Sequence, residues 1–197
     1  LLWEHGPASR VELGEITGLT TAALSGIARE LMNQRLLCEF GQGESSVGRK
    51  PVKLGINKDA GRVAGVRLQK DCLEVVIYDL AGNPLARKYK SMAITGADQV
   101  AEALRIQIGQ AAEAAGARFE DVAVVAVASP GLIITEAGVV HFSANLGWRD
   151  VPLRDVLGVR LGKPVLVENV ANAAALAAYR GRVVGDVEHR LVLQAVV

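Results

Sequence analysis

The pattern of apolar and polar positions opens with two short helical stretches separated by a glycine. Ser9 and Glu12 form a capping box, which predicts a first helix that ends at Gly18. Thr20 is the expected N-cap of the second helix, and Leu19 is expected to be buried in the turn. The apolar residues of the second helix follow the spacing of one buried face. They are Leu24, Ile27, Ala28 and Leu31.

Two expected strands, residues 36–40 and 51–56, follow the helix pair and flank a polar, glycine-rich loop over residues 41–48. A helix pair followed by such a hairpin is typical of a winged helix-turn-helix, whose second helix enters the DNA major groove. The expected DNA contacts are Thr20, Thr21, Ser25, Arg29, Arg49 and Lys50. The alternative is a helical hairpin packed on a β-hairpin that binds protein or nothing.

The net charge of residues 1–57 argues against strong DNA binding by a single copy of this region. Residues 1–57 hold six Lys or Arg and six Asp or Glu, so their net charge is zero. Phosphate contacts drive DNA affinity, and a neutral module should bind weakly on its own. Two copies in a homodimer would double the contacts, so we expect a homodimer or a higher homo-oligomer.

From residue 58 onward the pattern alternates between strands and helices. The expected strands are residues 63–68, 72–79, 84–91, 122–128, 138–142, 164–168 and 191–197, and the expected helices are residues 97–116, 153–161 and 172–180. The continuous apolar run at 122–128 predicts a strand buried on both faces. This order predicts an α/β, ribonuclease-H-like domain of the actin and sugar-kinase type. We therefore expect two domains, residues 1–57 and 58–197.

Ligands in open α/β sheets bind beyond the carboxyl ends of the strands. Those ends are expected at Gly131 and at Asn169, and the loop over residues 143–148 could close over them. Asn145 and Asn169 carry amides suited to sugar hydroxyls, Glu168 could accept from such hydroxyls, and Trp148 could stack on a sugar face. The asparagines could instead serve turns and helix caps, and Trp148 could fill the core.

Composition narrows the class further. The 197 residues are 50% hydrophobic with a net charge of +1, and no apolar run approaches the length of a membrane span. No signal peptide is visible, and the cysteines, Cys38 and Cys72, lack a metal-ligand spacing. We expect a cytoplasmic protein without a bound metal or cofactor. The chain starts without methionine, at what looks like the end of a helix, so we expect a trimmed chain.

Several stretches together resemble the regulator branch of the ROK family (repressors, open reading frames, sugar kinases). They are GRVAGVRLQKDCLEVVIYDLAGN, ASPGLI, SANLGWRDVPL and PVLVENVANAAALAAYRG, in the order of that family. The resemblance implies a bacterial-type transcription regulator, usually a repressor, that binds double-stranded DNA and whose kinase-like domain senses a sugar. It also implies ligand contacts from Asn145 and Asn169, and Gly131 is expected to join them because of its place at a strand end. The zinc-binding cysteine cluster of the family lies further along than residue 197.

Three positions depart from the kinases of that family. Those kinases carry an acid and glycines where this sequence has Arg67 and Gln69, and their catalytic base stands where this sequence has Val170. Valine cannot accept a proton, so general-base catalysis is lost at that position. We therefore expect no enzyme activity. The alternatives are a sugar kinase with an added N-terminal domain and a regulator that binds no ligand.

The helix front departs from the family as well. Family regulators often carry one arginine just after the cap of the recognition helix and another later in it. Here those positions are Thr21 and Gly26. Base preference is therefore expected to depend on Thr20, Thr21 and Ser25, with a larger contribution from the wing.

Overall fold

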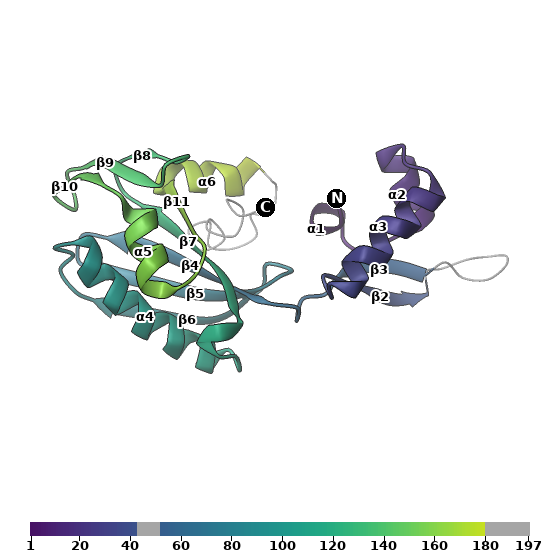
Figure 1. Ribbon diagram of the computed structural model, residues 1–197, viewed down its shortest axis with the longest axis horizontal. Coiled ribbons are helices and arrows are strands. Elements are labelled where there is room, and N and C mark those ends of the chain that lie inside the picture. The colour runs from purple at the N-terminus through teal and green to yellow at the C-terminus, as the bar shows by residue number, and fades with distance from the viewer. Residues whose placement is uncertain (43–51, 180–197) are drawn as a thin grey trace. The chain divides into compact units, whose positions relative to one another are not determined.

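The computed structural model describes residues 1–42 and 52–179, and the chain divides into two compact units, Leu1–Ala60 and Gly61–Val197. Both units combine helices with sheets (Figure 1). The mixed α/β architecture predicted from the sequence is confirmed, whereas the domain identities assigned to residues 1–57 and 58–197 remain predictions. Arg49, Lys50 and the expected strand over residues 191–197 lie outside the described residues.

The first unit is built from short elements. In chain order they are α1 (Leu2–His5), β1 (Ala8–Ser9), α2 (Arg10–Thr17), α3 (Thr21–Asn33), β2 (Leu37–Gln42) and β3 (Val52–Ile56). The three strands form an antiparallel sheet in the order β1-β3-β2. The sequence does not predict β1, because two residues are too few to show an alternating pattern.

Helices α2 and α3 have the predicted caps. The Oγ of Ser9 accepts a hydrogen bond from the backbone N–H of Glu12 at 3.2 Å, and the Glu12 carboxylate accepts one from the Ser9 N–H at 2.6 Å. The backbone hydrogen bond from Ser9 holds the pKa of Glu12 below its usual value. Gly18 ends α2 with a φ of 70°, and the Oγ1 of Thr20 accepts from the Ala23 N–H at 3.3 Å.

The first unit has a small core. Its buried residues are Leu13, Leu24, Ala28 and Leu54. Leu24 and Ala28 confirm part of the predicted buried face of α3, and Leu31 is half-buried. The predictions for Ile27 and Leu19 are wrong, because these side chains are 48% and 43% exposed. The strip of α3 that α2 and the hairpin cover is narrower than the four-residue apolar stripe.

The second unit is organised around one five-stranded sheet. Its strands are β4 (Arg62–Gln69), β5 (Cys72–Asp79), β6 (Pro84–Ser91), β7 (Val122–Ser129) and β11 (Val165–Asn169), in the spatial order β11-β7-β4-β5-β6. Strands β4, β5 and β6 form the predicted antiparallel meander, and β7 and β11 pair in parallel beside β4.

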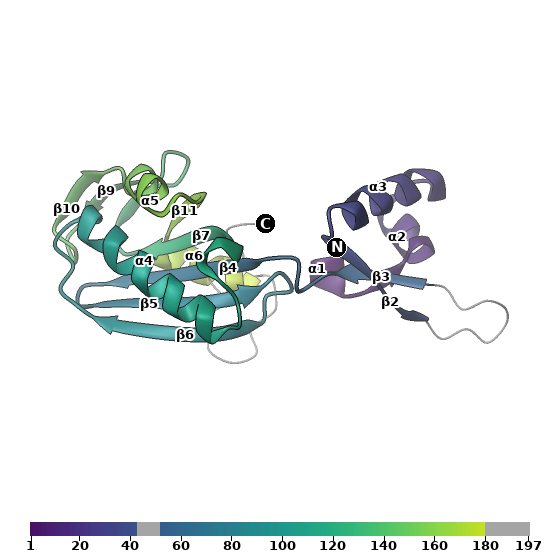
Figure 2. The ribbon, with the colours of Figure 1, turned by 60° about the horizontal axis from the view of Figure 1, so that its bottom comes forward.

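Helices cover both faces of this sheet (Figure 2). They are α4 (Ala97–Ala114), α5 (Leu153–Leu161) and α6 (Val170–Tyr179). Val125 and Val127 of β7 point into the core shared with α4 and α5, whereas Ala126 and Ala128 pack against α6. The prediction that β7 is buried on both faces fails at Ala123, which is exposed. The physical reason is a register shift in the pairing of β7 with β4, in which Val122 and Val124 have partners in β4 and Ala123 between them has none.

A small three-stranded sheet and a 3₁₀ turn complete the second unit. They are η1 (Phe119–Asp121), β8 (Leu132–Ile134), β9 (Val139–Ser143) and β10 (Trp148–Val151). The predicted strand over residues 138–142 is confirmed as β9, and the sequence misses the shorter β8 and β10. Trp148 pairs with Ser143 in β9 and is 4% exposed within the main core. The interpretation of Trp148 as a sugar-stacking surface is therefore wrong.

Candidate functional site

The candidate DNA-contact residues of α3 differ in how they are presented. Thr20, Thr21 and Arg29 are exposed, and Ser25 is half-buried. The hydroxyl oxygen of Thr20 already accepts the hydrogen bond that caps α3. Among the four candidate residues of α3, Arg29 has the longest side chain, and it is exposed to solvent.

The face of α3 that points furthest from the core is not the one favoured by the sequence reasoning. Successive helical residues are about 100° apart, so the direction opposite Leu24 and Ala28 can be read from the spacing. The residues that face that way, all exposed, are Ala22, Ala23, Gly26, Arg29, Glu30 and Asn33. Thr21 and Ser25 lie on a flank of the helix. A helical projection of the sequence could have found Ala22 and Asn33.

The hairpin contributes one described basic residue, Lys53. Lys53 is half-buried in β3, between Ser9 of β1 and Phe40 of β2. Arg49 and Lys50, the two residues predicted to hold phosphates from the wing, lie outside the described residues.

The predicted ligand residues Gly131 and Asn169 meet beyond the ends of β7 and β11. The amide nitrogen of Asn169 donates to the Gly131 carbonyl at 2.5 Å, and its amide oxygen accepts from the backbone N–H groups of Ala171 and Asn172 at 2.7 and 3.2 Å. Gly131 has a φ of 120°, and a Cβ there would collide with the Phe142 carbonyl. Asn169 thus caps α6, the alternative role that the sequence left open.

Glu168, which the sequence offers as a further contact for sugar hydroxyls, organises the same strand end. Its carboxylate accepts from the Asn169 backbone N–H at 2.6 Å, from the Asn172 amide at 3.1 Å and from the Thr135 hydroxyl at 3.3 Å. Arg154 of α5 fixes the neighbouring turn, because its guanidinium donates to the carbonyls of Thr135 and Glu136. A network of hydrogen bonds therefore connects α5, the β8–β9 turn and the start of α6.

Asn145 and Val170 complete the predicted ligand region. Asn145 is exposed in the turn between β9 and β10. Val170 is half-buried at the first position of α6 and packs against the alanine cluster of β7 and α6. A hydrocarbon side chain thus occupies the position where the ROK resemblance expects the catalytic base of a kinase.

Arg67, at the carboxyl end of β4, belongs to a charge network centred on Glu74. The Nε of Arg67 lies 3.3 Å from one Glu74 oxygen, and the Nε of Arg87 lies 3.7 Å from the other. The Glu74 side chain is 4% exposed. Gln69, with its amide oxygen turned toward Arg67, accepts from the guanidinium at 2.6 Å. A hydrogen bond to Glu74 raises the pKa of Tyr89 on the neighbouring strand.

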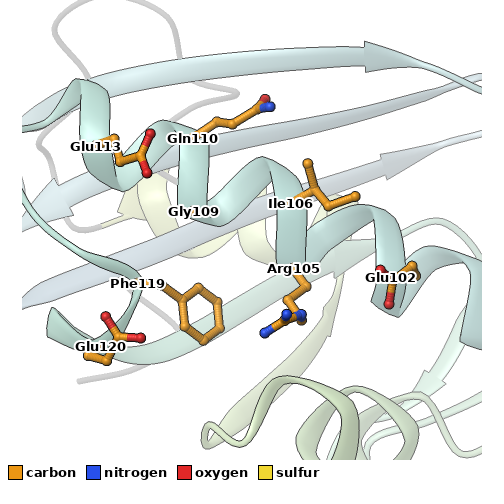
Figure 3. Close-up of a pocket in the computed structure, with 8 residues that line it drawn as sticks. All are labelled: Glu102, Arg105, Ile106, Gly109, Gln110, Glu113, Phe119 and Glu120. Atoms are coloured by element: carbon orange, nitrogen blue, oxygen red, sulfur yellow. The ribbon is translucent and has the colours of Figure 1, made fainter.

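A hollow of about 290 Å³ lies on the outer side of α4, beside η1 (Figure 3). Its lining residues are Glu102, Arg105, Ile106, Gly109, Gln110, Glu113, Phe119 and Glu120. Lys163 borders it, with Nζ 5.2 Å from the centre of the Phe119 ring and 2.9 Å from the Glu120 carbonyl oxygen. The hollow includes none of the predicted site residues.

Residues 1–42 and 52–179 offer neither a metal-binding cluster nor a helix that could span a membrane. In these ranges no cluster of three or more His, Cys, Asp or Glu side chains could hold a metal ion. Within the same ranges, no helix has the length and apolar character needed to cross a membrane.

Comparison with known proteins finds relatives in sequence and in structure. The sequence pattern described as "ROK family" matches residues 63–193. The putative xylose repressor of Caldicellulosiruptor sp. is 30% identical over 189 residues, which are 95% of this chain and 47% of that protein. The chain thus spans about half the length of this curated relative.

Two solved structures are also similar. One is a ROK family transcriptional regulator, a homologue of the Escherichia coli MLC protein, with a TM-score of 0.72, 28% identity, and coverage of 89% of this chain and 45% of that one. The other is the ROK hexokinase of Thermus thermophilus, with a TM-score of 0.52, 32% identity, and coverage of 60% of this chain and 38% of that one. The similarity to the regulator extends over more of this chain.

Proposed function

The chain belongs to the ROK family, and we propose that it is a sequence-specific DNA-binding transcription repressor whose second unit responds to a sugar or sugar derivative. The observation that carries the proposal is the first unit, in which two capped helices and a hairpin precede the family-matching region. A relative that covers the same two regions is named a putative xylose repressor.

The first unit is suited to DNA as a winged helix-turn-helix. Helix α3 presents its exposed face to the major groove, and Thr21 and Ser25 reach base edges from the flank of that face. Arg29 holds a phosphate, and Arg49 and Lys50 of the wing hold phosphates or enter the minor groove. Since residues 1–57 have no net charge, the working unit is a homodimer that doubles these contacts. Such a regulator acts where bacterial DNA lies, in the cytoplasm.

The second unit is suited to sensing and not to catalysis. Gly131 and Asn169 lie at the carboxyl ends of β7 and β11, where ligands of open α/β sheets bind, and Asn145 of the β9–β10 turn is the third proposed contact. Phosphoryl transfer is disfavoured, because Arg67 is held by Glu74 where a kinase would carry its acid, and Val170 stands in place of the general base. Sugar binding would then change the half-site spacing that the dimer can span.

The proposal is tested by binding of the chain to duplex DNA from upstream of its own gene, measured by fluorescence anisotropy with excess unrelated DNA. We expect saturable binding that survives the competitor, and release on addition of one sugar from a panel that begins with xylose. Binding that the unrelated DNA abolishes would contradict the repressor. Specific binding that no sugar alters would support a regulator independent of ligand, and sugar-dependent consumption of ATP would support a kinase.

A further inference from the structure

Gly26 stands in the middle of α3, where glycine is among the least favourable helical residues. The fold of the chain gives no reason for it. A Cβ built at Gly26 would meet nothing within 4 Å. By contrast, a Cβ at Gly14 of α2 would lie 3.4 Å from both the Leu19 carbonyl and the Leu24 side chain. Gly14 is explained by helix packing, and packing does not explain Gly26.

Gly26 lies at the centre of the exposed face of α3. Leu24 and Ala28 are buried on the other side of the helix, and Gly26 lies between them in sequence. Ala22 and Ala23 precede it by about one turn on the same face, and Arg29 and Glu30 follow it by about one turn. At Gly26 itself the helix surface thus consists of backbone and the two alanine methyl groups, and the polar side chains of Arg29 and Glu30 lie one turn further on.

We propose that Gly26 determines base preference by seating the methyl group of a thymine against α3. The inference rests on the proposed function, in which this face of α3 enters the major groove. In that groove the C5-methyl of thymine is the apolar group among hydrogen-bonding base edges. It matches the apolar patch that the methyl groups of Ala22 and Ala23 form with the bare backbone at Gly26, and the missing Cβ leaves the room that the thymine methyl occupies.

This role separates DNA binding from stability. Replacing Gly26 with alanine improves helix propensity and creates no clash within the chain. The variant should therefore fold and melt at a higher temperature. Its new methyl would occupy the space of the thymine methyl, so binding should weaken. A purely structural glycine would not produce opposite changes in these two measurements.

The experiment exchanges one methyl group for another. The probe is the duplex most enriched from a random library by the full chain, and the selection is repeated with Gly26→Ala to find the thymine at which the two preferences differ. That thymine is then replaced by uracil, which removes only the C5-methyl. Dissociation constants are measured for both chains on both duplexes. Gly109→Ala is the matched control, since Gly109 is also inside a helix and its Cβ would meet nothing within 4 Å.

We expect Gly26→Ala to bind the thymine duplex about tenfold more weakly than the unsubstituted chain, which corresponds to about 1.4 kcal/mol. The uracil duplex should restore most of this loss, and Gly109→Ala should bind both duplexes like the unsubstituted chain. Equal binding of the thymine duplex by Gly26→Ala would overturn the inference, as would a loss that persists on the uracil duplex. Both outcomes leave the proposed function standing. A library without an enriched duplex would contradict the proposed function and the inference with it.

Discussion

Arg67 and Glu74 face each other across β4 and β5, with the Arg67 Nε 3.3 Å from a carboxylate oxygen that is almost fully removed from water. Burying a charge is costly unless a partner compensates it, and here a second guanidinium, Arg87, approaches the other oxygen. Glu74 on β5 thus compensates the positive charge of Arg67 on β4. Position 67 therefore carries an arginine in place of the acid of the kinases, and a buried ion pair that the sequence alone does not reveal stabilises it.

The first prediction concerns this network and the free energy of unfolding. Glu74→Gln keeps the shape of the side chain but leaves Arg67 and Arg87 without their shared counter-charge. We expect a loss of about 3 kcal/mol, as is typical when one partner of a buried pair is removed. Chemical denaturation of the chain measures it. The control is Asp98→Asn, which breaks an ion pair on the surface, where the Arg160 side chain is 62% exposed and the Asp98 side chain 72%. Its loss should cost less than about 1 kcal/mol of stability.

The second prediction concerns the pH dependence that Tyr89 introduces. Its hydrogen bond to Glu74 favours the protonated phenol and raises the pKa in the folded state above the ordinary 10.0. A raised pKa contributes stability that is fully present below the unfolded pKa and is lost as pH rises through the folded pKa. Alkaline titration of phenolate absorbance should show the Tyr89 transition moving to lower pH in Glu74→Gln. Tyr89→Phe identifies which transition belongs to Tyr89, and an unmoved transition would contradict the role of Glu74.

The sequence anticipates the helices well and the site only in part. The capping box of Ser9 and the cap at Thr20 can be predicted because they depend on neighbouring residues. The exposure of Ile27 and the burial of Trp148 could not, because they depend on which distant elements cover them. Similarly, the hydrogen bond from Thr135 to Glu168 joins residues that are far apart in the chain, and no local pattern marks it.

The third prediction concerns the salt dependence of DNA binding. Arg49→Ala with Lys50→Ala should weaken binding to all duplexes and reduce the slope of log affinity against log salt by about two, one for each phosphate that the variant no longer neutralises. Anisotropy titrations at several salt concentrations give the slope. The control removes two exposed basic residues from the second unit, Lys70→Ala with Arg105→Ala. An equal change of slope in the control would point to net charge and not to the wing.

The fourth prediction concerns the missing general base. Val170→Asp places a carboxylate at the first position of α6, yet we expect no ATP consumption above that of the unsubstituted chain with any hexose. The reason is that Arg67 and Gln69 remain engaged with Glu74 and with each other where phosphates would have to bind. A coupled assay for ADP measures the rate. Sugar-dependent turnover by Val170→Asp alone would mean that the phosphate site survives these two departures.

The fifth prediction separates the two asparagines of the proposed ligand site. Asn169 caps α6 and holds the Gly131 carbonyl, so Asn169→Ala should cost about 1–2 kcal/mol of stability. Asn145 is exposed in a turn, and Asn145→Ala should change stability by less than about 0.5 kcal/mol. If both amides contact the sugar, calorimetric titration should show weaker binding in both variants, with reduced stability in one alone. Because Asn145→Ala leaves the fold unchanged, unaltered sugar affinity in this variant would remove Asn145 from the site, and weaker binding confined to Asn169→Ala would then reflect the uncapped helix.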